Sequence, residues 1–195
     1  DKNKSNSINE SLNFTESKLS TEEICRKYKG KVWLVDFNYQ PFKGECWNTI
    51  QRISLHIGVN VFQNKCSKIA LIDADEFIYV SNYSNINNFF SQYKGKTITM
   101  KSNILTNKNK NDIINNNILD LCMYVGENKY TKTIIDTSLL KSLEFIVTPH
   151  KHSTQILLDK NEIIHYHCWV NERYKYNENM VKLTILKDLK KKYYK

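Results

Sequence analysis

The stretch Lys68-Ile-Ala-Leu-Ile-Asp-Ala-Asp-Glu-Phe-Ile-Tyr79 decides the fold expected for this chain. It opens with a continuous apolar run through Ile72, which is typical of a strand covered on both faces. Before it come an apolar run, Val32–Val35, and a helical pattern from Glu45 to about Gly58. This order predicts a parallel βαβ unit within an α/β fold, in which helices flank a mostly parallel, Rossmann-like sheet.

Further elements extend outward from this unit. Ser20 and Glu23 form a capping box that predicts a helix to about Tyr28. The Asn/Lys-rich stretch Asn103–Asn117 predicts a surface loop. The remaining patterns predict a helix over Ser84–Tyr93, strands at Lys96–Met100, Lys132–Asp136, Glu144–Thr148, Thr154–Leu158 and Glu162–Trp169, and an amphipathic helix over Asn171–Lys195.

Length and composition favour one domain over residues 1–195, because 195 residues with 41% hydrophobic side chains can bury a core. The sequence shows neither an apolar run long enough to cross a membrane nor a signal peptide. Its five cysteines are scattered and contain no C-x-x-C pair, so we expect a reducing compartment, the cytoplasm.

The net charge of +9 indicates attraction to anionic partners. Nearly all of the positive charge is lysine, which lacks the planar, bidentate geometry that arginine offers to bases and phosphates. We therefore expect no specific nucleic-acid binding, and favour anionic substrates, with peripheral association with a membrane surface as a further possibility.

Three acidic residues, Asp73, Asp75 and Glu76, follow the apolar strand. Their carboxylates repel one another unless a cation or ligand neutralises them. In an extended strand Asp73 and Asp75 project to the same side, which offers two oxygen donors to Mg²⁺ or Mn²⁺. The alternative is a solvated acidic turn without a ligand.

The apolar run followed by D-x-D-E-F resembles the DxD-containing strand of GT-A glycosyltransferases, in particular family-2-like and family-92-like enzymes. Asp1-Lys-Asn-Lys-Ser-Asn6 resembles the turn that closes their second strand, and Cys46–Val59 resembles the helix before the DxD strand. Tyr130-Thr-Lys132-Thr-Ile-Ile135 and Ile164-His-Tyr166 resemble two later elements. If Asp1 corresponds to the second-strand turn, the first strand and helix of the nucleotide-binding half precede residue 1.

This resemblance implies a GT-A-like single domain that transfers a sugar, with inversion, from a nucleotide-diphosphate sugar to a hydroxyl of a glycan or other acceptor. A metal on Asp73 and Asp75 would hold the diphosphate. Asp1 and Asp73 would contact the nucleotide sugar, and Arg52 and Lys132 are candidate diphosphate contacts.

Histidines near the end of the chain supply a candidate third metal ligand. His165 follows an apolar pair and matches the His-Tyr element of the resemblance, so we rank it first. His167 shares its strand face and is the runner-up, and His150 comes third. A zinc site built from several histidines is a weaker alternative. Spacing does not choose among Glu127, Asp120 and Asp136 as the general base.

Two other functions fit the same residues. A metal-dependent phosphoesterase or nuclease would use the acids and histidines with a second metal and no acceptor. A non-catalytic module that binds carbohydrate or nucleic acid would not need a metal.

Overall fold

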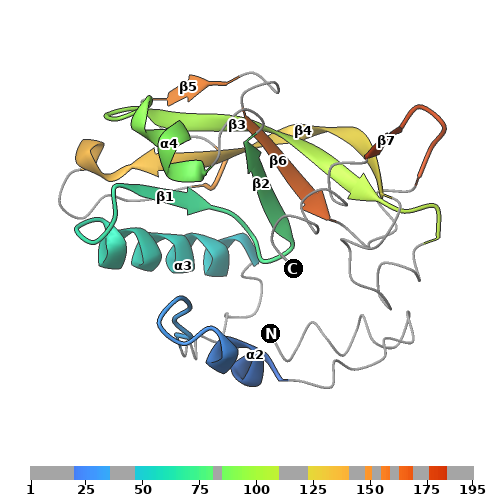
Figure 1. Cartoon of the computed structure of the whole chain (residues 1–195). Coiled ribbons are helices and arrows are strands. Elements are labelled where there is room, and N and C mark those ends of the chain that lie inside the picture. Colours follow the sequence, from blue (N-terminus) through green and yellow to red (C-terminus); the bar gives the residue numbers. More distant parts are fainter. Residues whose placement is uncertain are drawn as a thin grey trace.

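The computed structural model describes residues 20–35, 47–80, 85–109, 123–140, 148–150, 155–158, 163–168 and 176–183. Within these residues three α-helices accompany a seven-stranded sheet (Figure 1). No helix in this part of the chain is long and apolar enough to cross a membrane. The elements are α2 (Thr21–Lys27), α3 (Trp47–Phe62), β1 (Lys68–Leu71), β2 (Glu76–Val80), α4 (Ile86–Ser91), β3 (Thr97–Thr106), β4 (Met123–Asp136), the 3₁₀ turn η2 (Thr137–Leu139), β5 (Gln155–Leu157), β6 (Ile163–Cys168) and β7 (Val181–Leu183).

The sheet is mixed, so the prediction of a mostly parallel, Rossmann-like sheet is wrong. Its strand order is β1-β4-β3-β6-β2, with β5 on β3 and β7 on β4. The pairs β1/β4, β3/β4, β2/β6 and β4/β7 are antiparallel, and only β3/β5 and β3/β6 are parallel. Parallel neighbours need a crossover of about a dozen residues. The four residues between β1 and β2 form a turn instead, and the long strand β4 returns beside β1.

The predicted first strand, Val32–Val35, is not part of the sheet. Only an isolated bridge between Lys29 and Val32 involves this run, and Trp33 and Val35 are 68% and 67% exposed. The Trp33 ring lies 5.5 Å from that of Phe62 on α3. The expected βαβ unit therefore lacks its first strand. The apolar run Val32–Val35 indicated a buried strand, but it lies outside the sheet.

The predictions of helices α2 and α3 hold, with one correction to the end of α3. Ser20 and Glu23 form the expected capping box at the start of α2. Helix α3 continues through Gly58 to Phe62 and does not stop at the glycine. A glycine inside a helix costs only about 1 kcal/mol. Packing of Leu55 and Val59 against β1 offsets that cost.

The later strands differ mainly in their limits. Strand β3 extends to Thr106, so the start of the expected Asn103–Asn117 loop is sheet. Strand β7 pairs with β4 where the C-terminal helix was expected, and the helix prediction is wrong there because pairing with Met123–Val125 overrides helical spacing. The parts of these expectations at residues 110–122, 144–147, 171–175 and 184–195 lie outside the described residues.

Two apolar cores lie on opposite faces of β4. Ile134 and Ile135 are consecutive, so their side chains point to opposite sides of the sheet. Ile134 packs with Phe89 of α4, and Ile135 packs with Val59 of α3. Polar side chains of the same sheet lie beside the α4 core. Members of the α4 core are Phe89, Ile98, Met100, Ile134, Leu158 and Ile163.

Candidate functional site

The acidic turn between β1 and β2 is fixed by hydrogen bonds from three directions. The Asp73 amide donates to Glu76 Oε2 at 2.8 Å, and the Glu76 amide donates to the Asp73 carbonyl at 3.1 Å. From β6, the Cys168 amide donates to the Asp75 carbonyl at 2.9 Å. Asp73 and Asp75 therefore lie on a turn and not on an extended strand, and their carboxylates reach different partners.

Sheet register brings polar residues from four strands to one face. Glu76 pairs with His167, and Ser102 pairs with His165. Lys132 pairs with Met100, which lies two residues from Ser102 and shares its face. Paired residues and residues two apart share one side of a sheet. Figure 1 shows how β2 and β6 cross the end of the β3/β4 pair to complete this face.

Glu76 is the centre of the polar face. Its side chain is fully buried, and Oε2 lies within reach of three donors: the Asp73 amide at 2.8 Å, Lys132 Nζ at 3.0 Å and His165 Nε2 at 3.1 Å. Glu76 Oε1 and His165 Nε2 are both buried without a hydrogen-bond partner in the described part of the chain, so the 3.1 Å approach of His165 Nε2 to Oε2 is a close contact and not a well-aligned hydrogen bond. His167 Nδ1 lies 3.4 Å from Oε1.

Burial by itself raises the pKa of the Glu76 carboxyl. The adjacent His165 imidazole and the hydrogen bond from the Asp73 amide outweigh burial, and the positive charge of Lys132 adds to them, so that the pKa is lowered to about 2. Glu76 is thus ionised at neutral pH in spite of its burial.

Lys132 holds two of the three acids. Its buried ammonium lies 2.8 Å from Asp73 Oδ2 and 3.0 Å from Glu76 Oε2. Gln51 of α3 donates to the other Asp73 oxygen at 3.4 Å. Lys132, expected to contact a diphosphate, is therefore engaged with carboxylates, and Asp73 has protein partners on both oxygens.

His165, ranked first as a metal ligand, is fully buried behind Glu76. Its Nδ1 lies 2.9 Å from Ser102 Oγ, which accepts a hydrogen bond from Asn128 Nδ2 at 3.2 Å. The Ser102 hydroxyl can also donate to Nδ1, and the other ring nitrogen, Nε2, faces Glu76. The geometry makes His165 a support for Glu76.

His167, the runner-up, lies at the open side of the cluster. Its Nε2 is 3.4 Å from Asp75 Oδ2, and its Nδ1 is 3.4 Å from Glu76 Oε1. The Asp75 side chain is 51% exposed, whereas that of Glu76 is fully buried. The imidazole therefore stands between one solvated and one buried carboxylate. Of the two histidines, His167 is better placed to reach a ligand that enters from solvent.

Several predicted residues lie apart from this cluster. Arg52 is exposed on α3, one position from Gln51, and Glu127 is exposed on β4. His150 stacks on Tyr130, and its Nδ1 contacts the Thr131 carbonyl. Asp1 and Asp120 lie outside the described residues.

Asp136, a candidate base, belongs to a structural ion pair. Its Oδ2 lies 2.8 Å from Lys68 Nζ, and its carboxylate accepts hydrogen bonds from Gly95 and Ser138. It is four residues from Lys132 along β4, which is about 13 Å. Burial alone would raise the pKa of Asp136, but the bonds from Lys68, Ser138 and Gly95 outweigh it and lower the pKa to about 2.

We predict that Asp136→Asn lowers the free energy of unfolding by about 2 kcal/mol at pH 7, because it removes charged hydrogen bonds. A lowered folded-state pKa gives stability that is present above the unfolded pKa and is lost as pH falls through the folded value, here between 3.8 and about 2. Urea unfolding at pH 7, 4 and 2 checks both effects. A variant whose deficit does not shrink toward pH 2 would contradict the assignment, and Glu178→Gln, at an exposed position, is the control.

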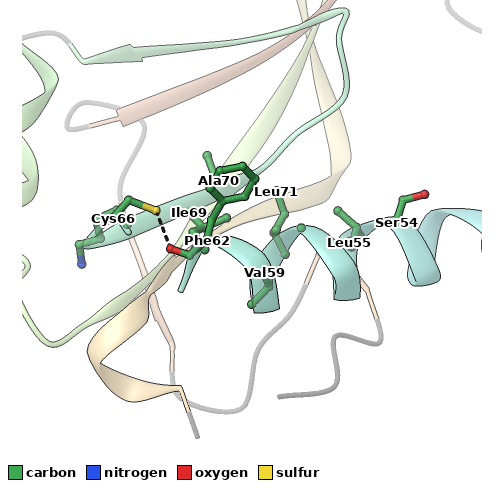
Figure 2. A pocket seen from close by; sticks show the side chains of 10 residues that line it. Ser54, Leu55, Val59, Phe62, Cys66, Ile69, Ala70 and Leu71 are labelled. Atoms are coloured by element: carbon green, nitrogen blue, oxygen red, sulfur yellow. Dashed lines mark hydrogen bonds between the residues drawn. The ribbon is translucent and has the colours of Figure 1, made fainter. Parts of the chain in front are cut away.

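An apolar groove lies between α3 and β1, with a volume of about 250 Å³ (Figure 2). It extends from Ser54 to Cys66, whose Sγ donates to the Phe62 carbonyl at 3.3 Å. Its lysine, Lys68, is engaged with Asp136. The groove therefore lacks the polar groups of the cluster and is not part of the candidate site.

Sequence reasoning missed the roles of four residues: Gln51, Glu76, Ser102 and Asn128. A signal existed only for Glu76, which lies in phase with the core residues Ile78 and Val80 and should therefore point inward. The others depend on strand register that the sequence did not reveal.

Among the described residues, no group of three or more His, Cys, Asp or Glu side chains is arranged so that it could hold a metal ion. Burial, followed by the charge of Asp75, raises the pKa of the Cys168 thiol to about 12. No protein-family model, curated protein or solved structure matches the chain. The chemistry of the cluster therefore carries the functional argument.

Proposed function

We propose that this protein is a metal-dependent glycosyltransferase that uses a nucleotide-diphosphate sugar as donor. The observation that carries the proposal is the pair formed by the Asp75 carboxylate and the His167 imidazole, 3.4 Å apart at the open side of a buried polar cluster. The D-x-D-E-F motif, which resembles that of GT-A enzymes, supplies the class of substrate. A mixed sheet is compatible with this function, because activity depends on the residues of the site and not on the fold.

The spacing of this pair fits two ligands of one metal ion. Adjacent ligands of an octahedral ion with bonds of about 2.1 Å are about 3.0 Å apart. The atoms Asp75 Oδ2 and His167 Nε2 need to approach by only a few tenths of an ångström from 3.4 Å. Carboxylate oxygen and imidazole nitrogen together suit Mn²⁺.

Charge also favours a cation here. The carboxylates of Asp73, Asp75 and Glu76 carry three negative charges, and the Lys132 ammonium carries one positive charge within hydrogen-bonding distance of two of them. Two negative charges remain when the histidines are neutral, which matches one divalent ion.

Two protein ligands are enough for an ion that also binds substrate phosphates. Mg²⁺ sites commonly use one or two carboxylates, with waters and phosphate oxygens completing the shell. When bound, the ion would stabilise the negative charge that develops on the departing nucleoside diphosphate. The exposed Asp75 and the largely buried His167 would hold it, while Asp73 and Glu76 keep Lys132 in place.

The same geometry favours transfer over two-metal hydrolysis. A two-metal phosphoesterase places its ions about 4 Å apart with acidic ligands around both. Here the Lys132 ammonium occupies the position between Asp73 and Glu76 that a second ion would need.

The test is the release of nucleoside diphosphate from a panel of UDP- and GDP-sugars with Mn²⁺, in the presence of mixed glycan acceptors. We expect release with at least one donor and its loss in EDTA. Hydrolysis of a phosphodiester substrate without any activity on nucleotide sugars would overturn the proposal in favour of a phosphoesterase.

A further inference from the structure

We infer that Glu76 is a positioning residue, which accepts the Nδ1 proton of His167 and so directs the Nε2 lone pair toward the metal. The inference rests on the proposed function, because it assumes that His167 is a ligand. It assigns a role to the third acid of the Asp73–Glu76 turn, which neither binds the ion nor faces solvent.

The two oxygens of Glu76 have different environments. Oε2 lies near three donors, from Asp73, Lys132 and His165. Oε1 is buried without a hydrogen-bond partner among the described groups, although it lies 3.4 Å from His167 Nδ1. A buried acceptor that lacks a donor costs about 1–3 kcal/mol. A small rotation of the imidazole would remove this cost by bringing Nδ1–H onto Oε1.

Both ring nitrogens of His167 face a carboxylate at 3.4 Å, so distance alone does not choose the tautomer. Solvation does. The Asp75 carboxylate is 51% exposed and can accept hydrogen bonds from water, whereas the Glu76 side chain is 0% exposed and cannot. The single proton of a neutral imidazole therefore stabilises the protein more on Nδ1, beside Glu76.

With the proton on Nδ1, His167 Nε2 and Asp75 Oδ2 are two electron-pair donors that face each other. A metal ion bound to both atoms would make this arrangement favourable. Histidine ligands usually donate their second ring N–H to a carboxylate, which fixes the ring orientation and raises its basicity. Glu76, His167 and Asp75 are in the right order for such a unit.

Glu76→Gln tests the inference sharply, because the Asp73 amide and the Lys132 ammonium at Oε2 require the amide oxygen at that position. The amide nitrogen then replaces Oε1 and donates to His167 Nδ1. This reverses the tautomer and puts the proton on Nε2, where it blocks metal binding. We expect affinity for Mn²⁺ to fall about 10–100-fold, the usual effect of losing such a carboxylate.

The measurements are Mn²⁺ titration, with and without UDP, and the ¹⁵N shifts of the His167 ring in the metal-free protein. We expect the Nδ1–H tautomer in the wild type and the Nε2–H tautomer in the variant, a change that a purely structural effect would not produce. Glu178→Gln, at an exposed position, is the matched control and should alter neither readout.

Three results separate the possible failures. An Nε2–H tautomer in the metal-free wild type overturns the inference even if the variant does not fold. A wild type that binds Mn²⁺, with a folded Glu76→Gln variant of equal affinity, overturns the inference and leaves the proposed function intact. A wild type that binds no Mn²⁺ in either condition overturns both.

Discussion

Asp75→Ala should lower kcat/KM for glycosyl transfer by at least about 10³-fold while leaving the protein folded. Loss of a single group that stabilises developing charge in an active site commonly costs 10²–10³-fold, and loss of a metal ligand should reach the upper end of that range or exceed it. The Asp75 side chain is 51% exposed, so its removal costs little stability. Initial rates with the best donor, together with a thermal unfolding curve, check both statements.

The matched control for this variant is Glu22→Ala, which removes a carboxylate that is 61% exposed on α2 and lies in a surface ion pair. It should retain full activity. His167→Ala should resemble Asp75→Ala if the two side chains share one ion. A folded Asp75→Ala protein with near-normal turnover would reject the site.

Lys132→Met should lower the free energy of unfolding by about 3–5 kcal/mol, the usual cost of removing one partner of a buried ion pair. The Lys132 side chain is 5% exposed and that of Glu76 is 0% exposed, so the variant leaves a buried carboxylate without its ammonium. Chemical denaturation at pH 7 measures the loss. Lys182→Met, at an exposed position of β7, is the control and should change stability by less than about 0.5 kcal/mol.

A double-mutant cycle identifies the source of the Lys132 effect. In a Glu76→Gln background no buried carboxylate remains beside Lys132, so Lys132→Met should cost clearly less there than in the wild type. Equal costs in the two backgrounds would show that Lys132 acts through packing and not through the charge of Glu76.

The sequence predicted local structure better than topology. The capping box of Ser20 and Glu23 depends on neighbouring residues only, and it is present as expected. The apolar run at Lys68–Leu71 is indeed a strand. The same run was wrongly expected to have a parallel neighbour, because a continuous apolar pattern reports burial and not the direction of the adjacent strand. The antiparallel return of β4 beside β1 depends on a contact across more than sixty residues of sequence, as between Lys68 and Asp136.

The candidate site was predicted only in outline. Asp75 contacts His167, the runner-up among the histidines, whereas Asp73 is engaged by Lys132. The choice of His165 over His167 relied on its place next to an apolar pair, and that place is what buries it against Ser102. Asp136 was a candidate base because of its position in the sequence. Its carboxylate instead forms an ion pair with Lys68.

The central claim is that a divalent ion held by Asp75 and His167 binds the diphosphate of the donor. The most direct measurement is the melting temperature with UDP or GDP, in Mn²⁺ and in EDTA. A ligand at a hundred times its Kd stabilises a protein by about 2.7 kcal/mol, which for a chain of this size is a shift of about 5–10 °C. We predict such a shift with Mn²⁺ and none in EDTA or in Asp75→Ala. Equal stabilisation by the nucleotide in EDTA would contradict the account.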